Sequence, residues 1–482
     1  MDFIRKYYRY ILLSIPVISL LMHLHIFGMD LLGIHVWRQT ETQTTINNFF
    51  REDMNILNPR YNEHPETDRL HRMEFPLMQW LFACVYKVLG YHVIISRILT
   101  FIIGLFSVWG IYKLLLSISY RKEVATIGAW CFNFSPVFYY YTVNPLPDNM
   151  ALCCGIWSLY WYSRWMGGRQ WRSLLYGSIL LCIATMCKLP FIIYGAFPGT
   201  WLINEVLRRR MKAAHLFYAG AVMLLCLLPA ISWYAWVIPT WVIGAVYGVT
   251  NQTLNHPDLK KVMVGTFISV LPELLLNYAS VLFFLTGFYT IKARRLTASS
   301  LFLPLAVLGM VVIAYFLFEM NIIDLVHDYY LFPFLPVLFL LVAYGAEYLL
   351  TTHKYSRYLA MLCLIVLPLT AFLRADTRWD TNLPGVNTAY LKYKDELRTL
   401  TPPDARCVVG YDESHYILLY YIDRKGWAFD KTWFDAKLLE HFIAQGATYI
   451  FLDENVDKLP GIPEHLGEKV FDKDDLRVYK LR

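Results

Sequence analysis

The sequence has few charged residues and lacks the motifs of several common classes of site. Aspartate, glutamate, lysine and arginine make up 17% of its 482 residues, whereas 57% are hydrophobic. Its nine cysteines lie mostly inside apolar runs and show no paired CxxC spacing, so neither a disulfide framework nor a cysteine zinc site is indicated. No nucleotide-binding signature occurs anywhere in the chain, and we therefore expect no nucleotide cofactor.

The excess of positive charge does not indicate a nucleic-acid partner. The formal net charge is +7, but lysine and arginine occur in short clusters between apolar segments, as membrane topology requires. No basic stripe with interleaved aromatic stacking residues is present. We therefore expect no binding to nucleic acid.

Long apolar runs are what the sequence has in abundance. They contain far more apolar residues than one soluble core needs, and each is about twenty residues long, which is the length of a transmembrane helix. The first run, from about Tyr10 to Phe27, is followed by no small-residue cleavage site, so we interpret it as an uncleaved helix. The windows predict a polytopic α-helical membrane protein of about eleven spans. These spans are centred near residues 18, 105, 133, 156, 180, 198, 225, 278, 308, 340 and 365.

Basic clusters on alternate connections predict the orientation of these spans. All six mark the cytoplasmic side, so an odd number of spans that begins inside leaves the C-terminus outside. We therefore expect a multi-pass protein of the bacterial inner membrane with a cytoplasmic N-terminus and a periplasmic C-terminus. The clusters are Arg5-Lys6 with Arg9, Arg121-Lys122, Arg164 to Arg172, Arg208 to Lys212, Lys292 to Arg295, and Lys354 to Arg357.

The composition changes near Ala375, where charged residues begin to interleave with shorter apolar runs. We predict a transmembrane module over residues 1–374, whose outer loop 28–93 carries interfacial helices such as Phe75 to Leu89, and a soluble α/β domain over residues 375–482. Within that domain we expect strands at Arg406–Tyr411 and Thr448–Leu452, helices at Ser414–Ile422 and Ala436–Gln445, and a last strand or hairpin within Glu468–Leu481.

The polar groups suited to chemistry gather in the predicted outer loops. Each also has an ordinary interpretation: Asp148 is suited to cap a helix, Lys188 lies where a lysine snorkels, His256 is a typical solvated histidine, and an aromatic belt explains Tyr330. The first loop itself could be a solvated loop with a helix that begins near Thr40. The candidates are Arg38, Glu41, Arg72 and Glu74 in the first loop, then Asp148, Lys188, His256, His327 and Tyr330.

The order of four motifs carries a resemblance. Thr40-Glu41-Thr42 and the Glu-x-Pro at Glu74 lie in the first outer loop, a Pro-x-x-Asp ends at Asp148, and a Tyr-x-x-Pro-x-x-Pro begins at Tyr330. Over about residues 10–345 this arrangement resembles the GT-C superfamily of integral-membrane glycosyltransferases, and within it the aminoarabinose transferases acting on lipid A and the protein O-mannosyltransferases. Two positions depart from that pattern. Phe75 stands where the aminoarabinose enzymes carry lysine, and Thr40-Glu41 replaces the usual Asp-Glu pair, so the phosphate-binding cation must come from another position.

The resemblance implies a glycosyltransferase that takes a sugar from a polyprenyl-phosphate donor and passes it to a lipid, glycan or protein acceptor, with inversion. Such a transfer needs a carboxylate for the acceptor and cations for the departing phosphate. We assign Glu41 as the base or acceptor-orienting group and Asp148 as the second carboxylate. Glu74 and His256 are candidate ligands of a divalent metal such as Mg, Mn or Zn. The donor phosphate is assigned to Arg38, Arg72, Lys188, His327 and Tyr330.

Two other functions fit the same membrane class. A polysaccharide polymerase or ligase would use a diphosphate-linked donor. A flippase or transporter of lipid-linked sugars predicts ionisable groups near the middle of the bilayer and an internal repeat. The charges of this chain lie at the predicted outer edge, and no repeat is found, so the transferase is the preferred hypothesis.

Overall fold

The structure is a computed structural model that describes residues 1–482 except 242–244, 251–257, 294–298, 325–326, 431 and 454–455. The chain divides into two compact units. The first, here called the helical unit, contains Met1–Phe27, Met73–Phe75 and Arg97–Asp376. The second, here called the sheet unit, contains Gly28–Arg72, Pro76–Ser96 and Thr377–Arg482. Each is described by itself.

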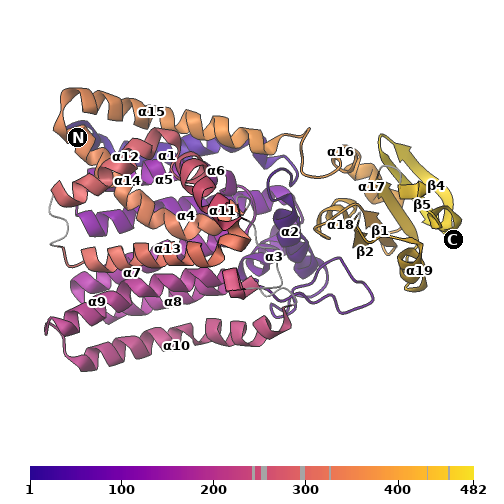
Figure 1. The fold of residues 1–482 in the computed structure, drawn as a ribbon, viewed down its shortest axis with the longest axis horizontal. Coiled ribbons are helices and arrows are strands. Elements are labelled where there is room, and N and C mark those ends of the chain that lie inside the picture. The colour runs from indigo at the N-terminus through magenta and orange to yellow at the C-terminus, as the bar shows by residue number, and fades with distance from the viewer. Residues whose placement is uncertain (242–244, 251–257, 294–298, 325–326, 431, 454–455) are drawn as a thin grey trace. The chain divides into compact units, whose positions relative to one another are not determined.

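The helical unit is built from long apolar helices (Figure 1). Short 3-10 segments connect several of them, and a π-helix, η4, follows α11 directly. The α-helices are α1 (Asp2–Phe27), α4 (Val93–Ser119), α5 (Lys122–Asn133), α6 (Pro136–Tyr141), α7 (Pro147–Gly168), α8 (Trp171–Cys187), α9 (Ala196–Leu207), α10 (Ala213–Val237), α11 (Leu259–Gly265), α12 (Tyr278–Ala293), α13 (Phe302–Ile323), α14 (Leu335–Thr352) and α15 (Lys354–Asp376). The other segments are η1 (Leu189–Gly195), η2 (Ile238–Thr240), η3 (Ala245–Thr250), η4 (Thr266–Leu275) and η6 (Asp328–Phe334).

The membrane class predicted from the sequence is confirmed, whereas the number of spans stays a prediction. Among the described residues, six helices are long and apolar enough to cross a membrane, and the bent pair Leu259–Leu275 and Tyr278–Ile291 brings the number to seven if it forms one span. The eleven predicted centres all fall within helices or at their first or last residue. Several of these helices are shorter than the roughly twenty residues that a transmembrane helix needs. Helix α8, with 17 residues, is one of them.

Close helix packing shapes the helical unit. Helix α8 lies against both α7 and α10, which Figure 1 shows side by side with it. Helices α12 and α14 approach each other so closely that a Cβ at Gly345 would lie 1.8 Å from the backbone oxygen of Phe283. A Cβ at Gly287 would in turn lie 2.4 Å from the backbone oxygen of Leu341. Glycine at both positions therefore allows the backbone contact that drives helix association in membranes.

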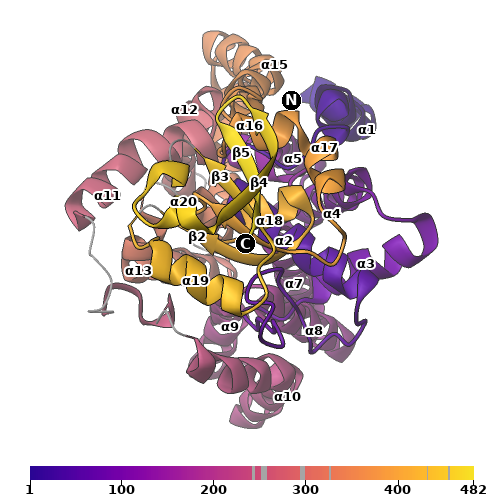
Figure 2. The same ribbon diagram turned by 90° about the vertical axis from the view of Figure 1, so that its right-hand side faces the viewer.

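The sheet unit combines a five-stranded sheet with helices (Figure 2). The strands lie in the order β2-β1-β3-β5-β4, with β1 parallel to β2 and β3, and β5 antiparallel to β3 and β4. The strands are β1 (Arg406–Gly410), β2 (Lys425–Phe429), β3 (Tyr449–Asp453), β4 (Leu466–Lys473) and β5 (Leu476–Leu481). The helices are α2 (Val36–Arg51), α3 (Leu77–Leu89), η7 (Thr377–Trp379), α16 (Thr388–Lys392), α17 (Lys394–Leu400), α18 (Ile417–Ile422), α19 (Ala436–Ala444), η8 (Val456–Lys458) and α20 (Ile462–His465).

Alternating side chains give this sheet two apolar faces, as the two-residue period of a strand requires. Val408 of β1 packs with Leu439 and Phe442 of α19 on one face. On the other face Cys407 and Val409 join a core that includes α18 and two residues of the first loop, Leu31 and Val36. The first outer loop therefore shares a hydrophobic core with the C-terminal sheet. The predicted boundaries, 1–374 and 375–482, stay predictions.

Most predicted elements outside the spans occur with small shifts. The helix expected near Thr40 is α2 and begins at Val36, and the interfacial helix expected from Phe75 is α3. The predicted strands correspond to β1, β3 and the β4–β5 hairpin, and the predicted helices to α18 and α19. Strand β2 was not predicted, because Lys425-Gly426 at its start is poor in strand-forming residues.

Candidate functional site

Lys188 lies at the centre of a buried charge cluster in the helical unit. Helix α8 ends at Cys187, and Lys188 follows in an extended conformation before η1, which begins at Leu189 and has Pro190 in its first turn. Its Nζ lies 2.9 Å from Glu74 Oε1 and 3.6 Å from Asp148 Oδ1. The three side chains are 8%, 12% and 1% exposed, respectively. Three of the predicted site residues, far apart in sequence, therefore meet in one place.

Backbone contacts with α8 and α10 position Glu74. The N–H of Phe75 donates to the backbone oxygen of Met186 at 3.0 Å, and the indole of Trp233 donates to the backbone oxygen of Met73 at 3.1 Å. The Phe75 ring meets Trp233 edge-on, with centroids 5.0 Å apart. Phe75 thus serves as an apolar anchor at the position where the aminoarabinose transferases carry lysine. In this chain Lys188 provides the cation beside Glu74.

Asp148 lies in the first turn of α7, which begins at Pro147 after the N-cap residue Leu146. The cap position predicted for Asp148 as its ordinary role therefore belongs to another residue. A carboxylate in the first turn is favoured by the positive end of the helix dipole. With 1% of its side chain exposed, Asp148 depends on such fixed dipoles and on Lys188 for the charge stabilisation that water would otherwise provide.

A buried arginine braces the loop that carries Asp148. Arg97, fully buried near the start of α4, donates from Nη1 to the backbone oxygen of Val143 at 3.0 Å and to Asn144 Oδ1 at 2.7 Å. Asn149 then donates to the backbone oxygen of Asn144 at 2.9 Å. This loop precedes α7, so its hydrogen bonds fix the start of the helix on which Asp148 stands.

Two aromatic residues of η6 cover Lys188. Its Nζ lies 4.4 Å from the ring centroid of Tyr330 and 5.7 Å from that of Tyr329, within the range of a cation–π contact. The backbone oxygen of Tyr330 accepts a hydrogen bond from Tyr315 Oη at 3.1 Å. The predicted phosphate ligand His327 meets the Tyr330 ring edge-on, with centroids 5.9 Å apart. Lys188, Tyr330 and His327 therefore form a continuous group in the helical unit.

The charges of this cluster define what it can do. One ammonium and two carboxylates sum to a net charge of −1, so the group can accept a proton or a further cation. Lysine suits this position because its ammonium is a compact point charge on a flexible stem and can exchange one oxygen partner for another. An arriving phosphate oxygen could therefore replace a carboxylate oxygen at Nζ without moving the helix ends.

A second buried ion pair lies in the sheet unit, on α2. Arg38 Nη1 contacts Glu41 Oε2 at 2.5 Å, and the two side chains are 7% and 9% exposed. Tyr61 Oη donates to the other carboxylate oxygen, Glu41 Oε1, at 3.0 Å. The predicted base and the predicted cation are thus partners of each other, and the phenol of Tyr61 completes the arrangement.

Tyr416, from the C-terminal part of the sheet unit, lies against Tyr61, the residue that donates to Glu41. Its ring meets that of Tyr61 edge-on, with centroids 4.9 Å apart. Burial raises the pKa of Tyr416 well above its usual value, and the negative charges of Glu41 and Glu63 act in the same direction. The phenol of Tyr416 consequently stays protonated at neutral pH.

The remaining predicted residues are less directly placed. In the sheet unit, Arg72 donates to the backbone oxygen of Leu57 at 2.8 Å and to Asn58 Oδ1 at 3.3 Å. His256 lies outside the described residues. Among the residues that the structure describes, no group of three or more histidine, cysteine, aspartate or glutamate side chains could hold a metal ion. The described surroundings of Glu74 therefore do not form a metal-binding set.

The sequence analysis missed two residues of this arrangement. Arg97 had a usable signal, because an arginine inside an apolar segment that crosses a membrane needs a polar partner. Tyr61 had none, since its neighbours in the sequence are ordinary loop residues and its contact with Glu41 spans twenty positions.

Comparison with known proteins agrees with the resemblance noted in the sequence. Residues 64–233 match the family described as dolichyl-phosphate-mannose-protein mannosyltransferase. A comparison of the sequence with curated proteins finds no match. Over nearly its whole length the chain has a fold similar to that of solved GT-C glycosyltransferases, which confirms the fold class and the resemblance predicted from the sequence.

Several solved structures share this fold. The chain is similar to ArnT from Cupriavidus metallidurans in the apo state, with 11% identity, a TM-score of 0.66 and coverage of 98% of each chain. The same protein bound to undecaprenyl phosphate gives 12% identity and a TM-score of 0.66, covering 99% of this chain and 98% of that one. AglB from Archaeoglobus fulgidus, in complex with an inhibitory peptide and a dolichol-phosphate, gives 13% identity and a TM-score of 0.60, covering 93% of this chain and 70% of that one.

Proposed function

We propose that this chain is a glycosyltransferase that moves a sugar from a polyprenyl-phosphate donor to a lipid, glycan or protein acceptor. The observation that carries the proposal is the buried Glu74–Lys188–Asp148 cluster beneath the ring of Tyr330, in a chain with the GT-C fold. The structure of ArnT with undecaprenyl phosphate and that of AglB with dolichol-phosphate support a polyprenyl-phosphate ligand for a chain of this fold.

The donor phosphate is assigned to Lys188, with His327 and Tyr330 beside it. A phosphate in an apolar environment is costly unless a cation compensates its charge. The Lys188 ammonium is largely buried, and its tyrosine neighbours offer a phenol and a ring face. Because charge on the phosphate increases as the sugar leaves, this lysine stabilises the departing group more than the bound donor, which is the condition for catalysis.

The transfer itself follows from the chemistry of the donor. An acceptor hydroxyl or amine attacks the anomeric carbon, the bond between that carbon and the phosphate oxygen breaks, and the electron pair leaves with the polyprenyl phosphate. The acceptor's proton passes to a carboxylate. Attack opposite to the phosphate inverts the anomeric centre. Glu41 keeps its predicted role as base or acceptor-orienting group, and Asp148, whose Oδ1 lies 3.6 Å from Lys188 Nζ, keeps its predicted role as the second carboxylate.

The chain's own contacts bear on the metal proposed for Glu74 and His256. A solved oligosaccharyltransferase of Archaeoglobus fulgidus is described in complex with Zn and sulfate. In this chain Glu74 Oε1 contacts Lys188, so a metal ion bound there would compete with the ammonium for the same oxygen. We therefore assign no step of the transfer to a metal.

The side of the membrane on which transfer occurs is part of the proposal. The basic clusters support an orientation in which Gly167 and Lys292 face the cytoplasm and residues 380–482 lie outside, in the bacterial periplasm. Reporter fusions at Gly167, at Lys292 and within residues 380–482 test this orientation. Fusions showing a cytoplasmic C-terminus would contradict transfer at the outer face.

A transfer assay with defined donors tests the function. The protein is purified, inserted into lipid nanodiscs and supplied with a sugar linked to undecaprenyl monophosphate or with an oligosaccharide linked to the diphosphate. We expect product and free undecaprenyl phosphate from the monophosphate donor only, formed more slowly by about 10² or more in the Asp148→Asn variant. Product from the diphosphate donor alone would identify a ligase or polymerase, whereas movement of the intact donor across the bilayer without transfer would identify a flippase.

A further inference from the structure

Tyr61 is held in place by aromatic contacts on two sides. It is 7% exposed, and its ring stacks on that of His71 with centroids 3.8 Å apart. On another side it meets the ring of Tyr416, which precedes α18 in the C-terminal part of the chain. These contacts set the direction of the Tyr61 hydroxyl, which donates to Glu41 Oε1.

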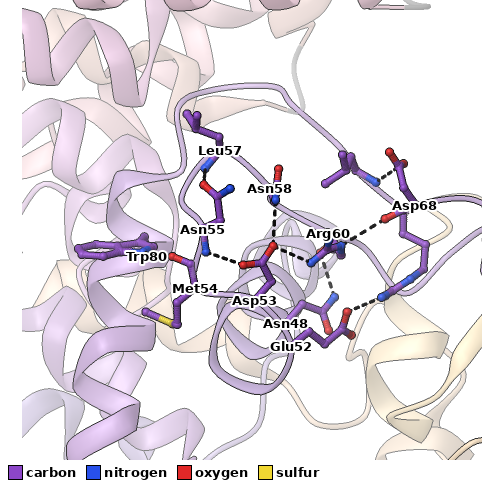
Figure 3. A network of polar contacts seen from close by, with 12 residues as sticks. Asn48, Glu52, Asp53, Met54, Asn55, Leu57, Asn58, Arg60, Asp68 and Trp80 are labelled. Carbon is purple, nitrogen blue, oxygen red and sulfur yellow. Dashed lines mark hydrogen bonds and ion pairs between the residues drawn. The ribbon is translucent and has the colours of Figure 1, made fainter.

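The loop that carries Tyr61 is internally braced. The backbone N–H of Tyr61 donates to the oxygen of Arg69 at 3.0 Å, and Arg69 Nη1 returns a bond to the oxygen of Tyr61 at 2.6 Å. Figure 3 shows the polar network at the base of this loop, where Asp53 accepts hydrogen bonds from the side chains of Asn58 and Arg60. These hydrogen bonds hold the loop, and Tyr61 with it, in one conformation.

This loop docks on the free edge of the C-terminal sheet. Strand β2 is an edge strand. The N–H of Gly426 in β2 donates to the oxygen of Asn62 at 3.0 Å, and the N–H of His64 donates to the oxygen of Gly426 at 3.1 Å. The indole of Trp427 also donates to Glu66 at 2.9 Å. An edge strand exposes backbone groups that need partners, and residues 62–64 supply them immediately after Tyr61.

We propose that Tyr61 is a positioning residue for Glu41 and that the C-terminal α/β segment, through Tyr416 and the edge of β2, holds Tyr61 in the hydrogen-bonding orientation. The inference rests on the role of Glu41 in the proposed function, and it gives the C-terminal segment a part in positioning the carboxylate. The segment acts on Glu41 without touching the reacting atoms.

The physical basis is the number and direction of donors on one carboxylate. Arg38 donates to Oε2 and Tyr61 to Oε1, so the plane of the Glu41 carboxylate is fixed from both sides. Donors to the charged form of a carboxylate favour its ionised state. A base must be ionised and correctly oriented to accept the acceptor's proton. Loss of the Tyr61 hydroxyl should therefore impair both properties, while the donor-binding residues of the helical unit stay unchanged.

The Tyr61→Phe variant tests this directly, because it keeps the ring contacts and removes only the hydroxyl. We expect kcat to fall by about tenfold or more, as for loss of a hydrogen bond to a charged group, with the KM for the donor unchanged. The acidic limb of the pH–rate profile should move to higher pH. Tyr416→Leu should shift both quantities in the same direction by less. Tyr449→Phe in β3 is the matched control and should behave as the unaltered protein.

A second readout needs no activity. Carbodiimide labelling of Glu41 in the full chain, followed by mass spectrometry, should be faster in Tyr61→Phe and Tyr416→Leu than in the unaltered protein or in Tyr449→Phe. If Glu41→Gln abolishes transfer while Tyr61→Phe leaves the rate, the pH profile and the labelling unchanged, the positioning role is wrong and the proposed function stands. The proposed role of Glu41 fails if the unaltered protein transfers no sugar or if Glu41→Gln transfers normally. In that case, labelling that is unchanged in Tyr61→Phe would also reject the hydrogen bond between Tyr61 and Glu41.

Discussion

The two units solve the problem of a buried charge in opposite ways. In the helical unit one flexible ammonium, Lys188, is shared between two carboxylates, Glu74 and Asp148. In the sheet unit one carboxylate, Glu41, receives two donors, the guanidinium of Arg38 and the phenol of Tyr61. The first arrangement leaves the cation able to change partners, whereas the second fixes the anion in one orientation.

Under the proposed function, this difference corresponds to two different chemical tasks. A donor phosphate must be bound and later released, which suits a lysine that exchanges oxygen ligands. A base must present a defined oxygen, which suits a carboxylate held by a rigid arginine fork. The supports differ as well, because helix ends hold the Lys188 cluster, whereas a loop docked on an edge strand holds Tyr61 beside Glu41. We therefore expect substitutions of these charged residues to lower the transfer rate in both units, and to weaken donor binding mainly in the helical unit.

The largest expected effect is the loss of rate on neutralising Glu41. Glu41→Gln keeps the size of the side chain and removes its charge, so transfer should fall by about 10² or more if a base is lost. Protein yield and donor affinity should stay normal, because the donor cation belongs to the other unit. Single-turnover transfer measures the rate, and Glu413→Gln, at an exposed position of the C-terminal segment, is the matched control. Normal turnover in Glu41→Gln would reduce the Arg38–Glu41 pair to a structural role.

Neutralising Asp148 should cost a similar factor in rate but differ in binding. Asp148→Asn removes one of the two carboxylates that share Lys188, so transfer should again fall by about 10² or more. Because the remaining cluster is less negative, the polyprenyl phosphate should bind as well as before or more tightly. Transfer rate and polyprenyl-phosphate affinity are measured on the same preparation. A weaker affinity together with an unchanged rate would show that Asp148 only organises the donor site.

Removing the ammonium should instead act on binding. Lys188→Met keeps the apolar stem and deletes the charge, so polyprenyl phosphate should bind about 1.5–3 kcal/mol more weakly, the range for a charge-assisted hydrogen bond. Lys212→Met, at an exposed lysine of the same unit, is the matched control. Arg72→Ala tests another of the predicted phosphate ligands. If Lys188→Met binds the lipid phosphate as tightly as the unaltered protein, the phosphate lies elsewhere and Lys188 is only an ion-pair partner of Glu74.

The two arrangements also differ in how much of them the sequence revealed. Apolar run lengths and clustered lysine and arginine predict the membrane class, because hydrocarbon thickness and hydration costs act on composition directly. Glu74, Asp148 and Lys188 stood out as polar groups at the edges of apolar segments. Their meeting in one cluster depends on how α7, α8 and α10 pack, which periodicity does not encode. Tyr61 was missed because a loop that pairs with an edge strand far along the chain leaves no local pattern in the sequence.

The smallest expected effect tests the docking of the first loop on the sheet. A hydrogen bond from His415 to Glu63 raises the pKa of this histidine above its usual 6.5, and the charges of Asp412 and Asp430 act in the same direction, while burial opposes them. A raised folded-state pKa means that the contact stabilises the protein fully below about pH 6.5 and that the stabilisation is lost as the pH rises through the folded-state value. His415 is 29% exposed, so we expect no more than about 1 kcal/mol after solvent screening.

The difference between the unaltered protein and His415→Gln isolates this contribution. Thermal unfolding of the full chain in nanodiscs should show a lower Tm for His415→Gln at pH 5.5 and a smaller difference at pH 8.5. His441→Gln, at an exposed histidine of α19, controls for the loss of a titratable ring. A pH-independent difference in Tm would show that His415 acts only by packing against Trp433. The docking of the loop would then rest on its backbone hydrogen bonds and on the bond from Trp427 to Glu66.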